Sequence, residues 1–397
     1  MDLYPRFRSI EPIQLPKESS NEVPRFLLRD AAGLSNEQVV VTLAGLIMME
    51  LADGTRTTEE IAGALKQQTG LVIQNQQVQE LFSSLDQRYL LDNARARRRL
   101  AEILPRPTRH SGGGYPETPG ELEPFLDDLL CADAPHESTG FCRASILPHI
   151  DFFRGRESYR AGYQFLHNLN SATTPLTVVI LGISHAVCRT PFILTRKDFD
   201  TPLGPVETDQ AMIDELCRNL PFDPFQDEYN HMAEHSVEFH AVLLKRLVRN
   251  RPLKIVPILC RSFFEAIRGR FTPLNLKGVR EFISNLQRLR DEHPEIHFLA
   301  SVDLAHMGLN FGGPPLSKSF LEELERRDLE SLQGIQKGLA DDFFATHQAD
   351  QGERNYCGTP AIYTLLTLFP QSFKLHRYQQ CSEPDFSSTV TICSATL

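Results

Sequence analysis

ASILPHID (residues 144–151), VVILGISHA (178–186) and FLASVDLAH (298–306) are three apolar runs that set the architecture of this 397-residue chain. Each run stops at polar residues, which is typical of a buried strand that reaches the edge of its sheet. The polar residues at these stops are His149, His185, Asp303 and His306. Open α/β sheets hold their ligands outside the carboxyl ends of the strands, so we predict that these side chains share one edge.

Residues 125–397 alternate between apolar runs and helical patterns. Strands are predicted at CRASILP, LTVVILGIS, LKIVPILC and IHFLASV, and amphipathic helices separate them. Buried strands separated by helices indicate an α/β domain with a central mixed sheet flanked by helices. We expect this domain to carry the metal chemistry of the chain.

Residues 1–104 are predicted to form a separate small domain. Thr57 and Glu60 have the spacing of a capping box at a helix start, and that helix is expected to end at Gly70. Two short strands and three helices of this size suggest a winged-helix fold. The next stretch, residues 105–124, is rich in Pro and Gly without periodicity, and we interpret it as a linker.

The pattern from PRFLLRD through AGLIMMELADGTRTTEEIAGAL to LDQRYLLD resembles PqqD-like domains. In peptide-modification systems, such domains bind a leader peptide along a strand and a helix. The resemblance therefore implies a peptide or protein partner for residues 1–104. The other interpretation is a small domain that only packs on its neighbour, and the sequence leaves both open.

Composition argues against two classes of partner. Asp+Glu 51 exceed Lys+Arg 41, so the net charge of −10 gives no support to nucleic-acid binding. The amino-terminal residues lack the apolar core of a signal peptide, and the longest apolar stretch is too short to span a bilayer. We therefore expect a cytoplasmic protein without a membrane partner. The eight cysteines show no CxxC pair and are expected to be reduced.

Cys357 differs from the other cysteines because polar residues precede it and a helix is predicted to start near Pro360. A thiol at a helix N-terminus lies at the positive end of the helix dipole, which favours the thiolate, a nucleophile and metal ligand. The alternative is a small buried residue in a tight loop. Spacing alone does not separate these two interpretations.

AEHSVEFHAVLL (233–244) gathers acidic and histidine side chains at the start of a predicted helix, with Glu234 and Glu238 one turn apart. The order is not HExxH, so a zinc-protease pair is not indicated. A solvated polar face is the commoner explanation of such a run, although its position also suits a pocket. Asp303 and His306 lie three residues apart; Asp303 could orient a histidine while His306 moves a proton.

Six motifs, PHID, LGISHA, TRKDFDTPLGPVETD, EHSVEFH, SVDLAHMG and YCGTP, occur in this order from residue 148 onward. In order and spacing they resemble the Memo family, and in particular the bacterial AmmeMemoRadiSam system protein B. The resemblance implies the fold of class III extradiol ring-cleaving dioxygenases, with a metal pocket at the sheet edge. This sequence departs from the family's motifs in three places: at the family form PHAGY, at the family form SHH, and in the residues around His306. These departures put substrate recognition in doubt rather than the capacity to bind a metal.

Carried over by the motifs, the family's metal ligands fall on His149, His185 and Cys357. Its pocket residues fall on Asp303 and His306, and its EHS motif places Glu234 and His235 among the catalytic candidates. Two imidazoles and a thiolate suit Fe(II), Cu or Zn, and the likeness to Fe(II) dioxygenases makes iron the first expectation.

Three functions are consistent with this sequence. The first is a metal-dependent oxidoreductase that acts on an unknown substrate, a peptide or protein if residues 1–104 bind one. The second is a non-catalytic peptide-binding adaptor that retains the metal pocket. The third is a zinc-dependent hydrolase, which the ligand order favours least. The family's system name also implies a radical-SAM enzyme as a pathway partner.

Overall fold

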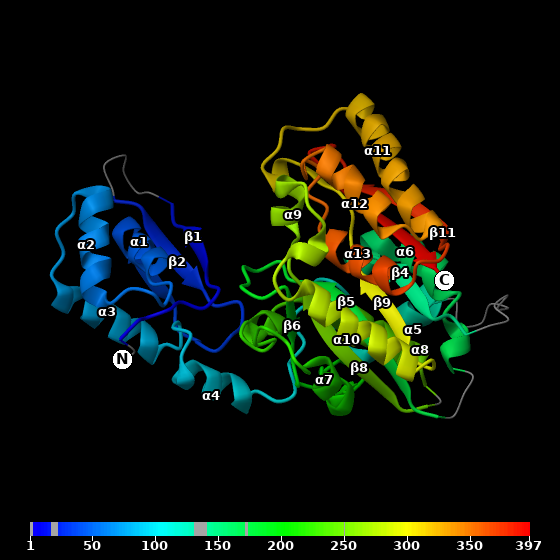
Figure 1. Cartoon of the computed structure of the whole chain (residues 1–397), viewed down its shortest axis with the longest axis horizontal. Helices are drawn as coiled ribbons and strands as arrows, with labels where there is room; N and C mark the ends of the chain where they lie inside the picture. Colours follow the sequence, from blue (N-terminus) through cyan, green and yellow to red (C-terminus); the bar gives the residue numbers. More distant parts are fainter. Residues whose placement is uncertain (1–2, 17–22, 131–140, 171–173, 250) are drawn as a thin grey trace. The chain divides into compact units, whose positions relative to one another are not determined.

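The structure is a computed structural model that describes residues 3–16, 23–130, 141–170, 174–249 and 251–397 (Figure 1). The chain divides into two compact units. Unit 1 comprises Met1–Leu104 and Tyr229–Ala233, and unit 2 comprises Pro105–Glu228 and Glu234–Leu397. The seven cysteines in the described part of the chain are free thiols, whereas Cys131 lies outside it. No helix among the described residues has both the length and the apolar character needed to cross a membrane.

Unit 1 contains a three-stranded antiparallel sheet and four helices. Its strands, in sheet order, are β1 (Glu11–Gln14), β2 (Arg25–Arg29) and β3 (Val39–Thr42). Its helices are α1 (Leu43–Leu51), α2 (Thr58–Thr69), α3 (Asn75–Gln87) and α4 (Ala94–Glu102). The capping box at the start of α2 is confirmed, because the Glu60 amide donates to Thr57 Oγ1 and the Thr57 amide donates to the Glu60 carboxylate. The helix ends at Gly70 in the left-handed conformation, φ 76°.

A short segment far along the chain also belongs to unit 1. Tyr229 and Met232 of η2 (Glu228–Met232) are buried in a cluster with Ala32, Leu34 and Leu100. No periodicity in the sequence indicated that this segment leaves the α/β domain. It immediately precedes Glu234, the residue at which the chain returns to unit 2.

Residues 105–124 are a folded part of unit 2, and their interpretation as a linker is corrected. The Arg106 amide donates to the Asp198 carbonyl at 2.8 Å, and the Arg106 and Tyr115 side chains are completely buried. Helix α5 (Pro119–Leu130) begins inside this stretch. Pro and Gly are typical of linkers, but composition does not reveal that the polar side chains between them are buried against another element.

Unit 2 is built on a nine-stranded mixed sheet, which confirms the predicted class of fold. Its seven-strand path runs β10–β12–β4–β9–β5–β8–β6, with β11 paired to β12 and β7 to β8. The four central strands are parallel: β4 (Ala144–Leu147), β9 (His297–Ser301), β5 (Leu176–Ile183) and β8 (Leu253–Cys260). The outer strands are β6 (Phe192–Leu194), β7 (Glu207–Thr208), β10 (His306–Gly308), β11 (Lys374–Ser382) and β12 (Ser388–Thr396).

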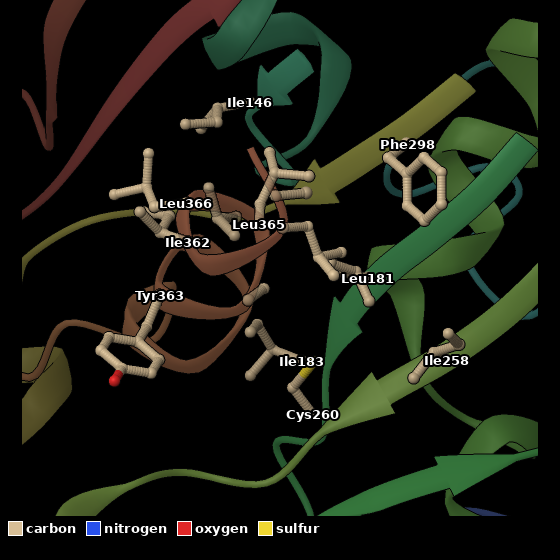
Figure 2. Close-up of a cluster of buried hydrophobic side chains, with 14 of the residues drawn as sticks. Ile146, Leu181, Ile183, Ile258, Cys260, Phe298, Ile362, Tyr363, Leu365 and Leu366 are labelled. Atoms are coloured by element: carbon tan, nitrogen blue, oxygen red, sulfur yellow. The ribbon is translucent and has the colours of Figure 1, made fainter. Parts of the chain in front are cut away.

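Helices cover both faces of this sheet. One hydrophobic cluster contains α5, α6 (Phe152–Tyr163) and α8 (His235–Leu247). The other contains α7 (Gln210–Leu216), α9 (Phe264–Gly269), α10 (Val279–Glu292), α11 (Lys318–Lys337), α12 (Ala340–Ala349) and α13 (Thr359–Leu368). Strand β5 serves both clusters, because alternate side chains of a strand point to opposite faces. In the second cluster, strand side chains meet those of α13, as Figure 2 shows for Ile146, Leu181, Ile183, Ile362 and Leu365.

Close contact between β5 and the start of α8 requires Gly182. A Cβ atom added there would lie 2.6 Å from Ser236 Oγ. We predict that Gly182→Ala lowers the free energy of unfolding by about 1–3 kcal/mol, because the methyl group overpacks this junction. Denaturant unfolding measures the change. Gly120→Ala is the control in the same unit: it meets open space and should stabilise by about 0.4–1 kcal/mol. Equal effects of the two substitutions would contradict the assigned contact.

Candidate metal centre

The carboxyl ends of β4, β9 and β5 lie at one edge of the sheet, because these strands are adjacent and parallel. His149 follows β4 and His185 follows β5, as the sequence predicted. The structure adds His235, the first residue of α8, to this pair. One ligand atom from each of the three imidazoles lies within 4.8 Å of the others. Their ring centroids are 4.9–5.2 Å apart.

Helix α8 reaches this edge because its first turn bonds directly to the end of β5. Ser236 Oγ accepts from the Ile183 amide at 3.0 Å and donates to the Ile183 carbonyl at 3.2 Å. Gly182 leaves the space for this approach. The Glu234 carboxylate caps the helix by accepting from the amides of His235 and Ser236 at 2.9 and 3.1 Å.

Two of the three imidazoles are hydrogen-bonded through Nδ1, and the third has its Nδ1 close to a carboxylate. His149 Nδ1 donates to the Ser301 carbonyl at 2.9 Å, which fixes the hydrogen on Nδ1 because a carbonyl oxygen only accepts. His185 Nδ1 and His235 Nδ1 lie 3.0 and 3.1 Å from oxygens of the same Glu234 carboxylate. A histidine whose Nδ1–H is held by an acceptor presents its Nε2 lone pair to a metal, and such anchoring is nearly universal among metal-binding histidines.

The electrostatics of the cluster match this role. Burial lowers the pKa of His149 to about 3, and burial likewise holds the pKa of His235 well below its usual value, so both imidazoles are neutral. Burial alone would raise the pKa of Glu234, but the charge of the neighbouring His185 and the hydrogen bonds from this residue outweigh it and keep the carboxylate ionised. Burial opposes the charge of His185 too, yet the Glu234 charge raises its pKa well above the usual value. A metal at His185 therefore displaces a proton.

Cys357 lies beside the three histidines. Its Sγ is 3.4 Å from His149 Nε2 and donates to the Asp303 carbonyl at 3.4 Å. Gly358 allows this approach, because a Cβ there would lie 2.6 Å from the same carbonyl oxygen. The helix dipole favours a thiolate, but burial acts against it. Burial raises the pKa of Cys357 and outweighs the His185 hydrogen bond, so the thiol is protonated until a metal displaces its hydrogen.

Asp303 and His306 lie around the cluster rather than in it. Asp303 Oδ1 accepts from the amides of His149 and Ile150 at 2.9 and 3.1 Å, so it fixes the backbone that carries His149. Burial raises the pKa of Asp303. His306 begins β10, and its Nδ1 donates to the Leu304 carbonyl at 3.0 Å. This bond leaves His306 Nε2 as the ring atom available for proton transfer.

Ser236, Glu238 and His240 of α8 are buried, which corrects the interpretation of this run as a solvated face. Glu238 is completely buried and binds the Arg106 guanidinium, the amides of Arg109 and His110, and the Tyr115 hydroxyl. His110 Nδ1 lies 3.1 Å from the same carboxylate, and its ring centroid is 5.5 Å from that of His235.

His240, also completely buried, connects α8 to the segment that carries His149. Its Nε2 donates to the Pro148 carbonyl at 3.1 Å, and its Nδ1 lies 2.7 Å from the Tyr163 hydroxyl. Helix α8 thus holds the segment that carries His149 as well as supplying His235. Sequence reasoning missed Arg106, His110 and Tyr115, whose only signal was the density of hydrogen-bonding residues in RPTRH and GGGY of the presumed linker.

Comparison with known proteins identifies the family of this domain. A family model described as Memo-like protein matches residues 106–396, so the chain belongs to the Memo family. A MEMO1 family protein of Aquifex aeolicus is 28% identical over 297 residues, which cover 73% of this chain and 74% of that protein. A MEMO1 family protein of Thermus thermophilus is 28% identical over 288 residues, 71% of this chain and 81% of the relative. The matched region begins inside the presumed linker, in agreement with the burial of Arg106.

The buried Glu238–Arg106 pair provides a stability test. Burial raises the pKa of Glu238, but its hydrogen bond from His110 and the charge of Arg106 outweigh this and place the pKa well below the usual 4.5. We predict that Glu238→Gln costs about 3–5 kcal/mol at neutral pH, because it leaves a buried guanidinium without its carboxylate. The stabilisation is present above the unfolded-state pKa of 4.5 and is lost as the pH falls below it.

Unfolding curves of the wild type and Glu238→Gln at several pH values measure this difference. The difference in the free energy of unfolding between the two proteins should become smaller below pH 4.5. Glu323→Gln, at an exposed ion pair with Arg326, is the control and should leave stability unchanged. A difference in the free energy of unfolding that stays constant down to the acid transition would contradict the pairing of Glu238 with Arg106.

Proposed function

We propose that this protein is a metal-dependent oxidoreductase of the Memo family that uses non-haem iron. The observation that carries the proposal is the cluster of the His149, His185 and His235 imidazoles, the first two held through Nδ1, with the Cys357 thiol beside them. Imidazole and thiolate donors suit Fe, Cu and Zn. Iron ranks first by the family's likeness to Fe(II) dioxygenases, and copper and zinc are the other candidate metals.

The resemblance assigns the metal to His149, His185 and Cys357, and the geometry offers His235 as a further donor. Iron held there supplies electron transfer to or from a bound substrate. The chain's own residues do the rest. Glu234 orients two imidazoles, Asp303 holds the backbone of His149, and His306 Nε2 is the group proposed to move a proton.

For unit 1 we propose the finer assignment that its sequence resemblance implies, a PqqD-like winged-helix domain that binds a peptide. Strand β1 pairs only with β2 among the described residues, so its other edge offers backbone groups to an added strand. A peptide or protein substrate, and a radical-SAM enzyme acting in the same AmmeMemoRadiSam-type system, belong to this proposal. The same edge strand supports the alternative, a non-catalytic peptide-binding adaptor.

Elemental analysis of anaerobically purified protein tests the metal assignment. We predict near-stoichiometric iron in the wild type and its loss in His149→Ala, because His149 Nε2 faces both the neighbouring imidazoles and the thiol. His376→Ala is the matched control. It removes a histidine that stacks on Phe165 and is not among the proposed ligands, so this variant should retain metal. Zinc in place of iron would favour hydrolysis or a structural site. Wild-type protein without any of the three metals would contradict the proposal and favour the adaptor.

Substitution with Co²⁺ distinguishes a metal held by His149, His185 and Cys357 from a metal held by His149, His185 and His235. If Cys357 binds the metal, the wild type shows a thiolate-to-cobalt charge-transfer absorption that Cys357→Ser abolishes, while His235→Ala retains it. We predict this outcome. A cobalt spectrum without the thiolate band, but sensitive to His235→Ala, would show that the three histidines bind the metal and that the thiol does not.

A further inference from the structure

Cys357 lies on a loop whose backbone an unrestrained chain would not keep. The loop, residues 350–358, connects α12 to α13 (Figure 1). Gln351, Gly352 and Asn355 have φ values of 53°, 77° and 47°, in the left-handed region that favours glycine. Such conformations persist only where the surrounding structure fixes them. The position of Cys357 at the three histidines therefore depends on what holds this loop.

The Arg354 side chain ties the loop to two helices. Arg354 is only 2% exposed. Its Nε donates to Asp350 at 2.6 Å, its Nη1 to Asp328 at 2.8 Å and its Nη2 to Ser331 Oγ at 2.9 Å. Asp328 and Ser331 belong to α11, and Asp350 caps the end of α12. A buried guanidinium needs such a complete set of acceptors, and its planar shape fixes their directions.

The Asp328 carboxylate connects this ion pair to the other side of the metal centre. Its Oδ1 accepts from Arg354, and its Oδ2 accepts from the hydroxyl of Thr391, on β12, at 2.6 Å. Thr391 Oγ1 in turn accepts from the Ala305 amide at 2.9 Å. The next residue, His306, donates its amide to the Arg354 carbonyl at 2.9 Å. The ion pair thus completes a network of hydrogen bonds that holds the loop against the segment that carries His306.

We propose that Arg354 and Asp328 are positioning residues of the candidate metal centre, which hold the Cys357 sulfur at the three histidines. They act through the loop backbone, since Cys357 follows Arg354 by three residues and its Sγ lies 3.4 Å from His149 Nε2. A ligand that is fixed in advance loses less conformational freedom when it binds. The role in metal binding rests on the proposed function, whereas the position of the thiol can be tested without a metal.

Alkylation of metal-free protein by iodoacetamide, followed by mass spectrometry, measures how firmly the loop is held. Arg354→Lys keeps the positive charge, but one ammonium group cannot form the three directed hydrogen bonds. We expect Cys357 to react about tenfold faster in this variant, because opening of the loop then breaks fewer charge-assisted hydrogen bonds. Cys260, which is completely buried on β8, should react at the wild-type rate and so reports an intact fold.

Two further variants separate positioning from general stability. Asp328→Asn should accelerate Cys357 to a similar extent, and the double variant should not exceed the single ones, because both substitutions break one pair. Arg251→Lys is the matched control. Arg251 is also buried, but it donates to backbone carbonyls beside the amino end of β5, so Cys357 should react in this variant as in the wild type.

Co²⁺ loading then tests the consequence for the metal. Arg354→Lys and Asp328→Asn should still bind cobalt through the histidines, but with most of the thiolate-to-cobalt absorption lost. A wild type without this absorption would count against Cys357 as a ligand in the proposed function, and the alkylation rates would still decide the positioning role. Alkylation of Cys357 at the wild-type rate in Arg354→Lys, or an equal acceleration of Cys260, would overturn the inference.

Discussion

One carboxylate at the start of a helix organises the candidate centre. Glu234 caps α8 by accepting from the amides of His235 and Ser236, it is hydrogen-bonded to His185 Nδ1, and it lies 3.1 Å from His235 Nδ1. An ionised carboxylate satisfies this many donors, whereas a neutral amide could not. Burial would normally neutralise this carboxylate, so the charged His185 imidazole and the amides at the helix start stabilise its charge in return. The position of β5 relative to α8 follows from this mutual dependence.

Helix α8 is consequently more than a cover for the sheet. Its first turn carries His235, bonds to the end of β5 through Ser236 and binds residues 106–115 through Glu238. His240, in the next turn, donates to the Pro148 carbonyl before His149. Three segments from distant parts of the sequence are thus fixed to one helix. Such a rigid arrangement of anchored imidazoles is what a metal site requires, since ligand orientation depends on the groups behind the ligands.

The sequence predicted the elements that depend on local pattern. Buried runs ending in His149 and His185 indicated strands that share an edge, and in the structure β4 and β5 lie on either side of β9 and are parallel to it. Two features depended on tertiary contacts and could not be predicted. Glu238 has the sequence context of a solvated residue, and only the folded chain brings Arg106 to it. The protonated state of Cys357 likewise follows from burial, which the dipole argument did not include.

The central claim is that the Nε2 atoms of the anchored histidines bind a metal. Anomalous diffraction from crystals of the iron-loaded protein measures this directly. The account predicts an anomalous peak bonded to Nε2 of His149 and of His185, with Nδ1 of each imidazole still held by Ser301 and Glu234. A peak bonded to neither histidine, or one that has displaced Glu234 from His185, would contradict it.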